Sequence, residues 1–189
     1  MTIYMKSFLL IPNLNRDIDL SVTLSAAGHL NRSGCVVAVP LEYIGERKLP
    51  EYIKILADNT SFSEYDAFIT FGGDGTILHI AKIASLLKKP ILGVNTGKLG
   101  FMTEIEPSEL FLLDELIRGE FTCEERMMLH VDLVRNNGKI YTSHALNDVV
   151  IANGEIHRPI TLSVLSNNKI IKEITGDGVI IASPTGSTA

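Results

Sequence analysis

One stretch constrains this chain more than any other, Phe68–Thr76, which reads FITFGGDGT. A short apolar run ends there in three glycines and an aspartate, and a segment of helical period, Ile77–Leu87, follows at once. A glycine-rich junction between a strand and a helix lets backbone N–H groups hold a phosphate at the helix N-terminus. The stretch therefore predicts a strand, a turn and a helix, with a phosphate site at the turn.

Short apolar runs alternate with segments of helical period through the first 120 residues. The expected strands are Ser7–Ile11, Cys35–Val39, Ala67–Phe71 and Ile91–Val94, and the expected helices are Asp17–Ser33, Leu49–Asp58, Thr76–Leu87 and Pro107–Arg118. This alternation is typical of a parallel sheet covered by helices.

Three details of the expected helices are specific enough to be checked. Asp17 and Asp19 are placed in the first turn of their helix, where the helix dipole favours negative charge. In Leu49–Asp58, the side chains Tyr52, Ile55 and Leu56 are expected to face inward. Ser108 is expected to cap the last helix.

The pattern changes near residue 121, where alternation of period two replaces the helical period. The expected strands are Arg126–Val134, Lys139–His144, Asp148–Ala152, Arg158–Leu165, Lys169–Thr175 and Val179–Ala182. Asn136-Asn137-Gly138 and Asn167-Asn168 are hairpin signals between them. We therefore expect an α/β N-terminal domain with a parallel sheet at 1–120 and an antiparallel β-rich domain at 121–189.

Composition limits the class of protein. The chain is 46% hydrophobic and 21% charged, as a globular protein is. A net charge of -5 argues against a dedicated nucleic-acid binder, which carries a basic excess. Two cysteines make no disulfide framework or zinc spacing, and the N-terminal apolar run is too short for a signal peptide or a membrane span. We expect a cytoplasmic protein with no nucleic-acid or membrane partner.

Candidate chemistry begins with Asp74, which has a glycine on each side. It either caps the following helix or serves as a general base that accepts a hydroxyl proton beside bound phosphate. The loop has no lysine after its glycines, so it is not a Walker A loop. A second glycine-rich loop, Asn95–Phe101, also follows a strand. Ligands bind beyond the carboxyl ends of parallel strands, so the two loops are expected to share one crevice.

The β-rich part holds further candidates. Asn147-Asp148 is either an ordinary turn or a pair that binds ribose hydroxyls or a metal. Asp177 lies in a Gly-Asp-Gly turn, and Arg158 is either a surface residue or a contact to phosphate or ribose. None of the five histidines pairs with another at metal-ligand spacing along the chain.

Four segments together resemble, in order and spacing, the motifs of the NAD kinase family. They read GGDGT at 72–76, NTGKLGF at 95–101, ALNDVVI at 145–151 and GDGVIIASPTGSTA at 176–189. GGDG alone is shared with diacylglycerol kinase, sphingosine kinase and phosphofructokinase relatives, whereas the set of four is specific. The resemblance spans residue 67 to the last residue.

The resemblance implies an enzyme that transfers a phosphoryl group to the 2′-hydroxyl of the adenosine ribose of NAD, giving NADP. It implies ATP or inorganic polyphosphate as donor, a divalent cation such as Mg²⁺ as cofactor, and a homodimer or homotetramer. Asp74 looks like the general base. The implied NAD-binding residues are Asp74, Gly75, Asn147, Asp148, Arg158, Thr175, Asp177, Thr185, Thr188 and Ala189. The implied donor-binding residues are Gly72, Gly73, Thr76, Asn95 and Gly97, and no metal ligand is assigned.

Two departures from the family pattern matter. Asp148 stands where the family more often has a glutamate, so its hydrogen bond needs a closer ribose or a bridging water. The chain also stops at Ala189, where the family continues, so we expect the native chain to be longer. A lipid kinase of the GGDG superfamily and a catalytically silent dinucleotide-binding module are the alternatives, and NAD titration with and without ATP and magnesium separates them.

Overall fold

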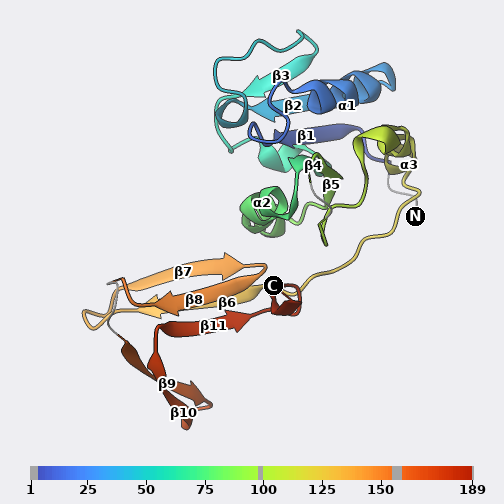
Figure 1. The fold of residues 1–189 in the computed structure, drawn as a ribbon. Coiled ribbons are helices and arrows are strands. Elements are labelled where there is room, and N and C mark those ends of the chain that lie inside the picture. Colours follow the sequence, from blue (N-terminus) through green and yellow to red (C-terminus); the bar gives the residue numbers. More distant parts are fainter. Residues whose placement is uncertain (1–3, 98–99, 155–158, 189) are drawn as a thin grey trace. The chain divides into compact units, whose positions relative to one another are not determined.

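The computed structural model describes residues 4–97, 100–154 and 159–188, and it divides into two compact units. Unit 1 is Met1–Glu124 and unit 2 is Glu125–Ala189 (Figure 1). Unit 1 is α/β and unit 2 is β-rich, which confirms the expected fold class. Each unit is described by itself below.

Unit 1 is built on a parallel sheet of five strands in the order β3-β2-β1-β4-β5. The strands are β1 (Ser7–Pro12), β2 (Val36–Pro40), β3 (Ile53–Leu56), β4 (Ala67–Gly72) and β5 (Ile91–Asn95). The α-helices are α1 (Ser21–Arg32), α2 (Asp74–Leu87) and α3 (Leu113–Arg118), and short 3-10 helices are η1 (Leu41–Tyr43), η2 (Phe62–Glu64) and η3 (Pro107–Leu112).

Both faces of this sheet are buried, because alternate residues of the central strands enter two different core clusters. Phe8 and Leu10 of β1 pack in one cluster with Leu30 of α1. Leu9 and Ile11 pack in the other, with Ile80 of α2 among its members. Burial on both faces explains why these strands read as continuous apolar runs rather than as alternating ones.

The expected helix over Leu49–Asp58 is wrong, since this segment holds the edge strand β3. Ile53 pairs in parallel with Val37 of β2. Ile53 and Leu56 are buried, whereas Tyr52 and Ile55 are 41% and 46% exposed, so of the three residues expected to face inward only Leu56 does. The backbone of β2 forms hydrogen bonds with this segment, and the pairing of the two strands outweighs the weak helical period of 49–58.

Helix α1 also begins later than expected, at Ser21, so Asp17 and Asp19 precede it. Asp17 is only 2% exposed. Its carboxylate accepts hydrogen bonds from the backbone N–H groups of Val22 and Thr23 at 3.1 and 2.9 Å, and from the Thr23 hydroxyl at 2.6 Å. Asp17 therefore stabilises the start of the helix from outside it.

The helical segment expected at Pro107–Arg118 has a different N-cap residue from the one expected. Glu106, rather than Ser108, is the N-cap residue of η3, and it forms a capping box with Glu109. The Glu106 N–H donates to the Glu109 carboxylate at 2.9 Å. Pro107 occupies the first helical position, where its missing N–H costs nothing.

Unit 2 consists of three antiparallel strand pairs. They are β6 (Leu129–Val134) with β7 (Ile140–Ala145), β8 (Asp148–Ala152) with β11 (Gly178–Ala182), and β9 (Ile160–Ser166) with β10 (Lys169–Gly176). Both expected hairpin turns form: Gly138 has φ 76°, and Asn167 and Asn168 have φ 49° and 61°. The short helix η4 (Gly186–Thr188) follows β11.

Replacing Asp17 with alanine is expected to lower the free energy of unfolding by about 1–3 kcal/mol, because it leaves the buried amide and hydroxyl of Thr23 and the partly buried amide of Val22 without their acceptor. The measurement is urea denaturation followed by helical circular dichroism, since all described α-helices lie in unit 1. Asp19→Ala is the matched control. Asp19 is exposed and accepts one backbone bond, from Ser21, so its loss is expected to leave the free energy of unfolding nearly unchanged. Equal losses in the two variants would contradict the buried role of Asp17.

Candidate active site at the carboxyl edge of the parallel sheet

Three strand ends meet at one edge of the sheet. Gly72, the last residue of β4, is in register with Asn95, the last residue of β5, and the Thr96 N–H donates to the Gly72 carbonyl at 2.9 Å. On the other side of β4, the Asn13 N–H donates to the Phe71 carbonyl at 2.9 Å. The loops after β1, β4 and β5 therefore form one region, as expected of parallel strands.

Asp74 is the first residue of α2, directly after the N-cap residue Gly73. Its carboxylate does not cap the helix. One oxygen accepts the N–H of Phe101 at 2.9 Å, and the other accepts the N–H of Met102 at 3.0 Å. A Cβ added at Gly100 would lie 2.7 Å from Asp74 Cγ, so the carboxylate rests against glycine backbone. Asp74 thus ties the start of α2 to the loop after β5.

Thr76 fills the space above Gly72. A Cβ at Gly72 would lie 2.9 Å from Thr76 Cβ, so only glycine fits there. The Thr76 hydroxyl accepts a hydrogen bond from the Asn13 side-chain amide at 3.1 Å. Gly72 is buried beneath this contact, whereas a Cβ at Gly73 or Gly75 would meet open space.

A cavity of about 290 Å³ opens above the start of α2. It is lined by Asn13, Arg16, Gly73, Asp74, Gly75, Thr76, Gly97 and Gly100. The N–H groups of Asp74 and Gly75 have no acceptor one turn back within the helix and are available to an anion, whereas the Thr76 N–H donates to the Gly73 carbonyl at 2.9 Å. Asn95 is buried beside it, and its side-chain oxygen accepts the Gly97 N–H at 3.0 Å. The predicted donor-binding residues therefore gather in and around one cavity of unit 1.

Arg16 places a positive charge beside this cavity, where the glycine-rich loop itself has no lysine after its glycines. A Cβ at Gly97 would lie 3.3 Å from its guanidinium, and among the described residues Arg16 has no carboxylate partner. Neither Arg16 nor Asn13 was predicted from the sequence. Both residues follow the first strand, and the rule that ligands lie beyond strand ends, applied to that strand too, would have found them.

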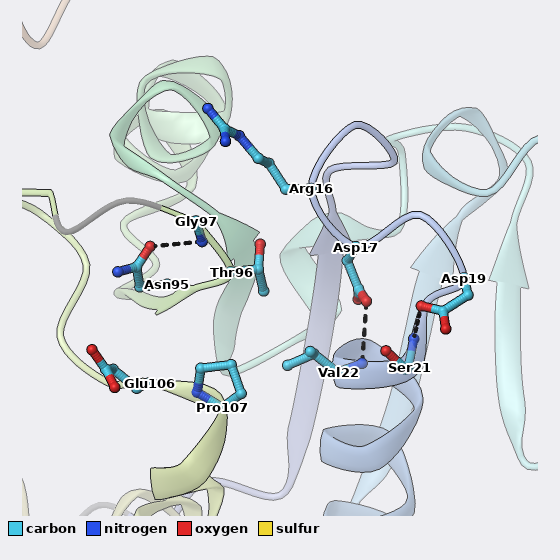
Figure 2. Close-up of a pocket in the computed structure, with 10 residues that line it drawn as sticks. All are labelled: Arg16, Asp17, Asp19, Ser21, Val22, Asn95, Thr96, Gly97, Glu106 and Pro107. Carbon is cyan, nitrogen blue, oxygen red and sulfur yellow. Dashed lines mark hydrogen bonds between the residues drawn. The ribbon is translucent and has the colours of Figure 1, made fainter.

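A neighbouring cavity of about 300 Å³ shares Arg16 and Gly97 with the first and is also lined by Asn95 and Glu106. Figure 2 shows Arg16 and Asp17 pointing away from one another, with Asp17 turned toward the start of α1. Hydrogen bonds from Ser21 lower the pKa of Asp19 at its rim. The Thr96 hydroxyl lines this cavity and is buried without a partner among the described residues.

Unit 2 brings two of the predicted segments together. Ala182 and Asp148 are in register at one end of the β8–β11 pair, and the Ser183 N–H donates to the Asn147 carbonyl at 2.8 Å. The Asn147 side-chain amide donates to the Asp148 carboxylate at 3.2 Å. A Cβ at Gly186 would lie 2.6 Å from the Asn147 carbonyl carbon, so η4 packs on the Asn147 backbone.

Other predicted residues of unit 2 lie apart from this group. Asp177 adjoins Gly178, which pairs with Ala152 at the opposite end of the β8–β11 ladder, roughly 13 Å away at about 3.3 Å per residue. The Thr175 hydroxyl contacts the Thr161 hydroxyl at 3.2 Å. Thr185 is half-buried before η4, which contains Thr188. Arg158 and Ala189 lie outside the described residues.

Within the described ranges, no group of three or more His, Cys, Asp or Glu side chains is arranged to hold a metal ion. No helix in those ranges is both long and apolar enough to cross a bilayer. The rings of His130 and His144, which lie 14 residues apart in the sequence, approach within 3.1 Å across β6 and β7, a proximity that spacing along the chain does not indicate.

A parallel α/β unit with a glycine-rich strand-to-helix junction at its carboxyl edge defines a class of proteins that bind phosphorylated ligands there. Residues 10–121 match the family model described as the ATP-NAD kinase N-terminal domain. The chain therefore belongs to the NAD kinase family.

Curated relatives agree with this assignment. An NAD kinase of a Thermoanaerobacter species is 41% identical over 197 residues, and one of Caldanaerobacter subterraneus is 40% identical over 192. Each match covers 98% of this chain but 65% of the relative, so the chain spans just under two thirds of their length. A crystal structure of yeast NADH kinase complexed with NADH has the same fold, with a TM-score of 0.87 and 24% identity over 98% of this chain and 56% of that one.

Replacing Gly100 with alanine is expected to displace the Asp74 carboxylate, because the added Cβ would overlap it. Loss of a charge-assisted hydrogen bond costs about 1.5–3 kcal/mol, so amide exchange at Phe101 and Met102 is expected to accelerate by roughly tenfold to a hundredfold. Gly75→Ala is the control, because Gly75 follows Asp74 in α2 and a Cβ added there would meet open space. Unchanged exchange in Gly100→Ala would show that the carboxylate is not held as described.

Proposed function

We propose that the protein is an NAD kinase, which phosphorylates the 2′-hydroxyl of the adenosine ribose of NAD in the cytoplasm to make NADP. The observation that carries the proposal is the Asp74 carboxylate, held by two backbone amides at the mouth of a cavity formed by the start of a helix. Family membership supplies the substrate.

Asp74 is the proposed general base. Each carboxylate oxygen accepts one amide N–H and retains a further acceptor position, so the amides orient the group without occupying it fully. In the proposed step the ribose 2′-oxygen forms a bond to the terminal phosphorus of ATP or polyphosphate, and the bond to the bridging oxygen breaks. The hydroxyl proton passes to Asp74, and the shortened donor leaves.

The donor phosphates are proposed to lie over the first turn of α2, against Gly73, Gly75 and Thr76, with Asn95 and Gly97 beside them and Gly72 beneath. A divalent cation such as Mg²⁺ would neutralise phosphate charge when bound. Mg²⁺ commonly uses one or two carboxylates, waters and phosphate oxygens rather than a protein cage, which suits a cavity with a single carboxylate, Asp74.

Arg16 is proposed to hold the donor phosphates from the opposite side of the cavity. It is exposed, lies over Gly97 and lines the cavity that contains Asp74. A guanidinium without a described carboxylate partner is free to form bidentate bonds to phosphate oxygens. It would also offset the repulsion between the donor and the Asp74 carboxylate.

Unit 2 is proposed to hold NAD. Asn147 and Asp148 offer an amide and a carboxylate to ribose hydroxyls, and η4 fixes their backbone. Asp177 directly precedes β11 at the other end of the β8–β11 ladder and is proposed to meet the nicotinamide end of the extended dinucleotide, with Thr175 of β10 as a further contact. Thr185, Thr188 and Ala189 are proposed for the adenosine pocket, with Gly75 beside the NAD and Arg158 as a further contact.

Assembly as a homodimer or homotetramer is part of the same proposal. Large apolar side chains of unit 2 are exposed, among them Ile170, Ile171 and Ile180 at 62–67%. Monomeric soluble proteins rarely expose extended apolar surface, so these strands favour burial against other protein.

Asp74→Asn in the full-length protein is expected to reduce kcat for NADP formation by about 10²-fold or more, because the proton acceptor is lost. The dissociation constant for NAD is expected to change little, as measured by titration in the absence of donor. Asp58→Asn is the control, since Asp58 is an exposed carboxylate that bonds only locally, to Thr60. Turnover within about tenfold of wild type would exclude the general-base role.

Arg16→Gln is expected to raise KM for the phosphoryl donor and lower kcat/KM by roughly 10–100-fold, the loss of about 1.5–3 kcal/mol of charge-assisted bonding. NAD affinity is expected to be unaffected, and Arg16→Lys is expected to recover part of the loss. Arg32→Gln, at the exposed end of α1, is the matched charge control. A donor KM equal to wild type in Arg16→Gln would remove Arg16 from the donor site.

A further inference from the structure

A pair of imidazoles lies on the β6–β7 hairpin, and neither histidine belongs to the segments that match the family motifs, although His144 directly precedes the segment 145–151. His130 of β6 and His144 of β7 are directly opposite in register. Their nitrogens, Nδ1 of His130 and Nε2 of His144, are 3.1 Å apart, and the rings meet edge to face at a centroid distance of 4.9 Å. Two ring nitrogens from different strands therefore converge on one point.

The other nitrogen of His130 is held by a carboxylate. His130 Nε2 lies 3.4 Å from an oxygen of Asp132, two residues along the same face of β6. The other Asp132 oxygen accepts the hydroxyl of Thr142, its cross-strand partner, at 2.6 Å. A carboxylate on one imidazole nitrogen fixes the tautomer that leaves the opposite nitrogen unprotonated, and this arrangement commonly surrounds histidine ligands of metals.

We propose that His130 and His144 form a binding site for a late first-row divalent cation such as Zn²⁺ or Ni²⁺, with Asp132 and Thr142 orienting the first ligand. Imidazole nitrogens are preferred ligands of these ions, at about 2.0–2.1 Å for zinc. Water completes the coordination, because His130 and Asp132 are exposed. This site lies in unit 2 and goes beyond the proposed kinase function.

The charge and shape of the surface favour a cation. The residues in register on this face are Val134, Asp132 and His130 on β6 and Ile140, Thr142 and His144 on β7, with no lysine or arginine among them. The hairpin turn at Gly138 fixes the pairing, so the ligands are held by backbone hydrogen bonds across two strands. A hydrogen bond between two exposed imidazoles competes with water and gains little, whereas a metal can bind both nitrogens at once.

The preference among cations follows from the ligands. Nickel and zinc stand near the top of the affinity order for nitrogen sites, whereas Mg²⁺ prefers oxygen ligands. A site with two histidines and water binds more weakly than a closed four-ligand site. Its occupancy would cross-link β6 to β7 and raise the stability of the hairpin.

The test is calorimetric titration of the full-length protein with ZnCl₂ and with NiCl₂, above the usual imidazole pKa of about 6.5. One saturable site per chain is expected, and MgCl₂ is not expected to compete for it. His130→Gln and His144→Gln are each expected to abolish the site. Asp132→Asn is expected to weaken it by about 10–100-fold, as removal of an outer-shell carboxylate does. His79→Gln, which removes an exposed histidine of α2, is the control.

A second readout identifies the ligands directly. Titration with diamagnetic Zn²⁺ is expected to shift the imidazole NMR signals of His130 and His144 together, and those of His79 not at all. The proposal would be overturned if no saturable metal binding were found below roughly 1 mM, or if His79→Gln lost as much metal affinity as His144→Gln. Neither readout uses NADP formation, so the site and the kinase function can fail separately.

Discussion

Parallel pairing of β4 with β1 on one side and β5 on the other is the constraint from which the rest of unit 1 follows. Parallel strands end at the same edge, so the pairing brings together loops that lie up to about 80 residues apart in the sequence. The bonds from Asn13 to Phe71 and from Thr96 to Gly72 continue the ladder past the strand ends. The glycine junction is thus held from both sides within unit 1, and the cavity lined by Gly73 and Gly75 lies over the start of the helix.

In the proposed reaction, Asp74 has to meet two conflicting requirements. A carboxylate beside bound phosphates is repelled by them, yet a base at a hydroxyl must be nearby. The amides of Phe101 and Met102 and the N-terminus of α2 supply partial positive charge that stabilises the carboxylate where it stands. Gly100 allows the approach because it has no side chain. The contact also makes the loop after β5 a support for the proposed base rather than only a neighbour.

The sequence predicted most strands and the shared crevice, because the buried strands carry apolar runs and the turns carry glycine or asparagine. It failed at β3, whose four residues are too few to show a period and whose edge position leaves Ile55 exposed. Arg16 and Asn13 were missed because the rule that ligands lie beyond strand ends was applied to the strands before the two glycine-rich loops and not to the first strand. The imidazole pair was missed because 14 residues separate its members. Counting equal numbers of residues outward from Asn137 along the two strands of the hairpin places His130 opposite His144.

The two units differ in how each one is stabilised internally. Both hydrophobic core clusters of the described residues lie in unit 1. Unit 2 has three two-stranded pairs with exposed apolar side chains, and isolated hairpins are marginally stable in water. The relatives extend beyond this chain, and further chain or a second subunit would bury such strands. The cavity that is proposed for the donor is therefore supported by the core of unit 1, whereas the order of the strands that are proposed to bind NAD depends on what covers them.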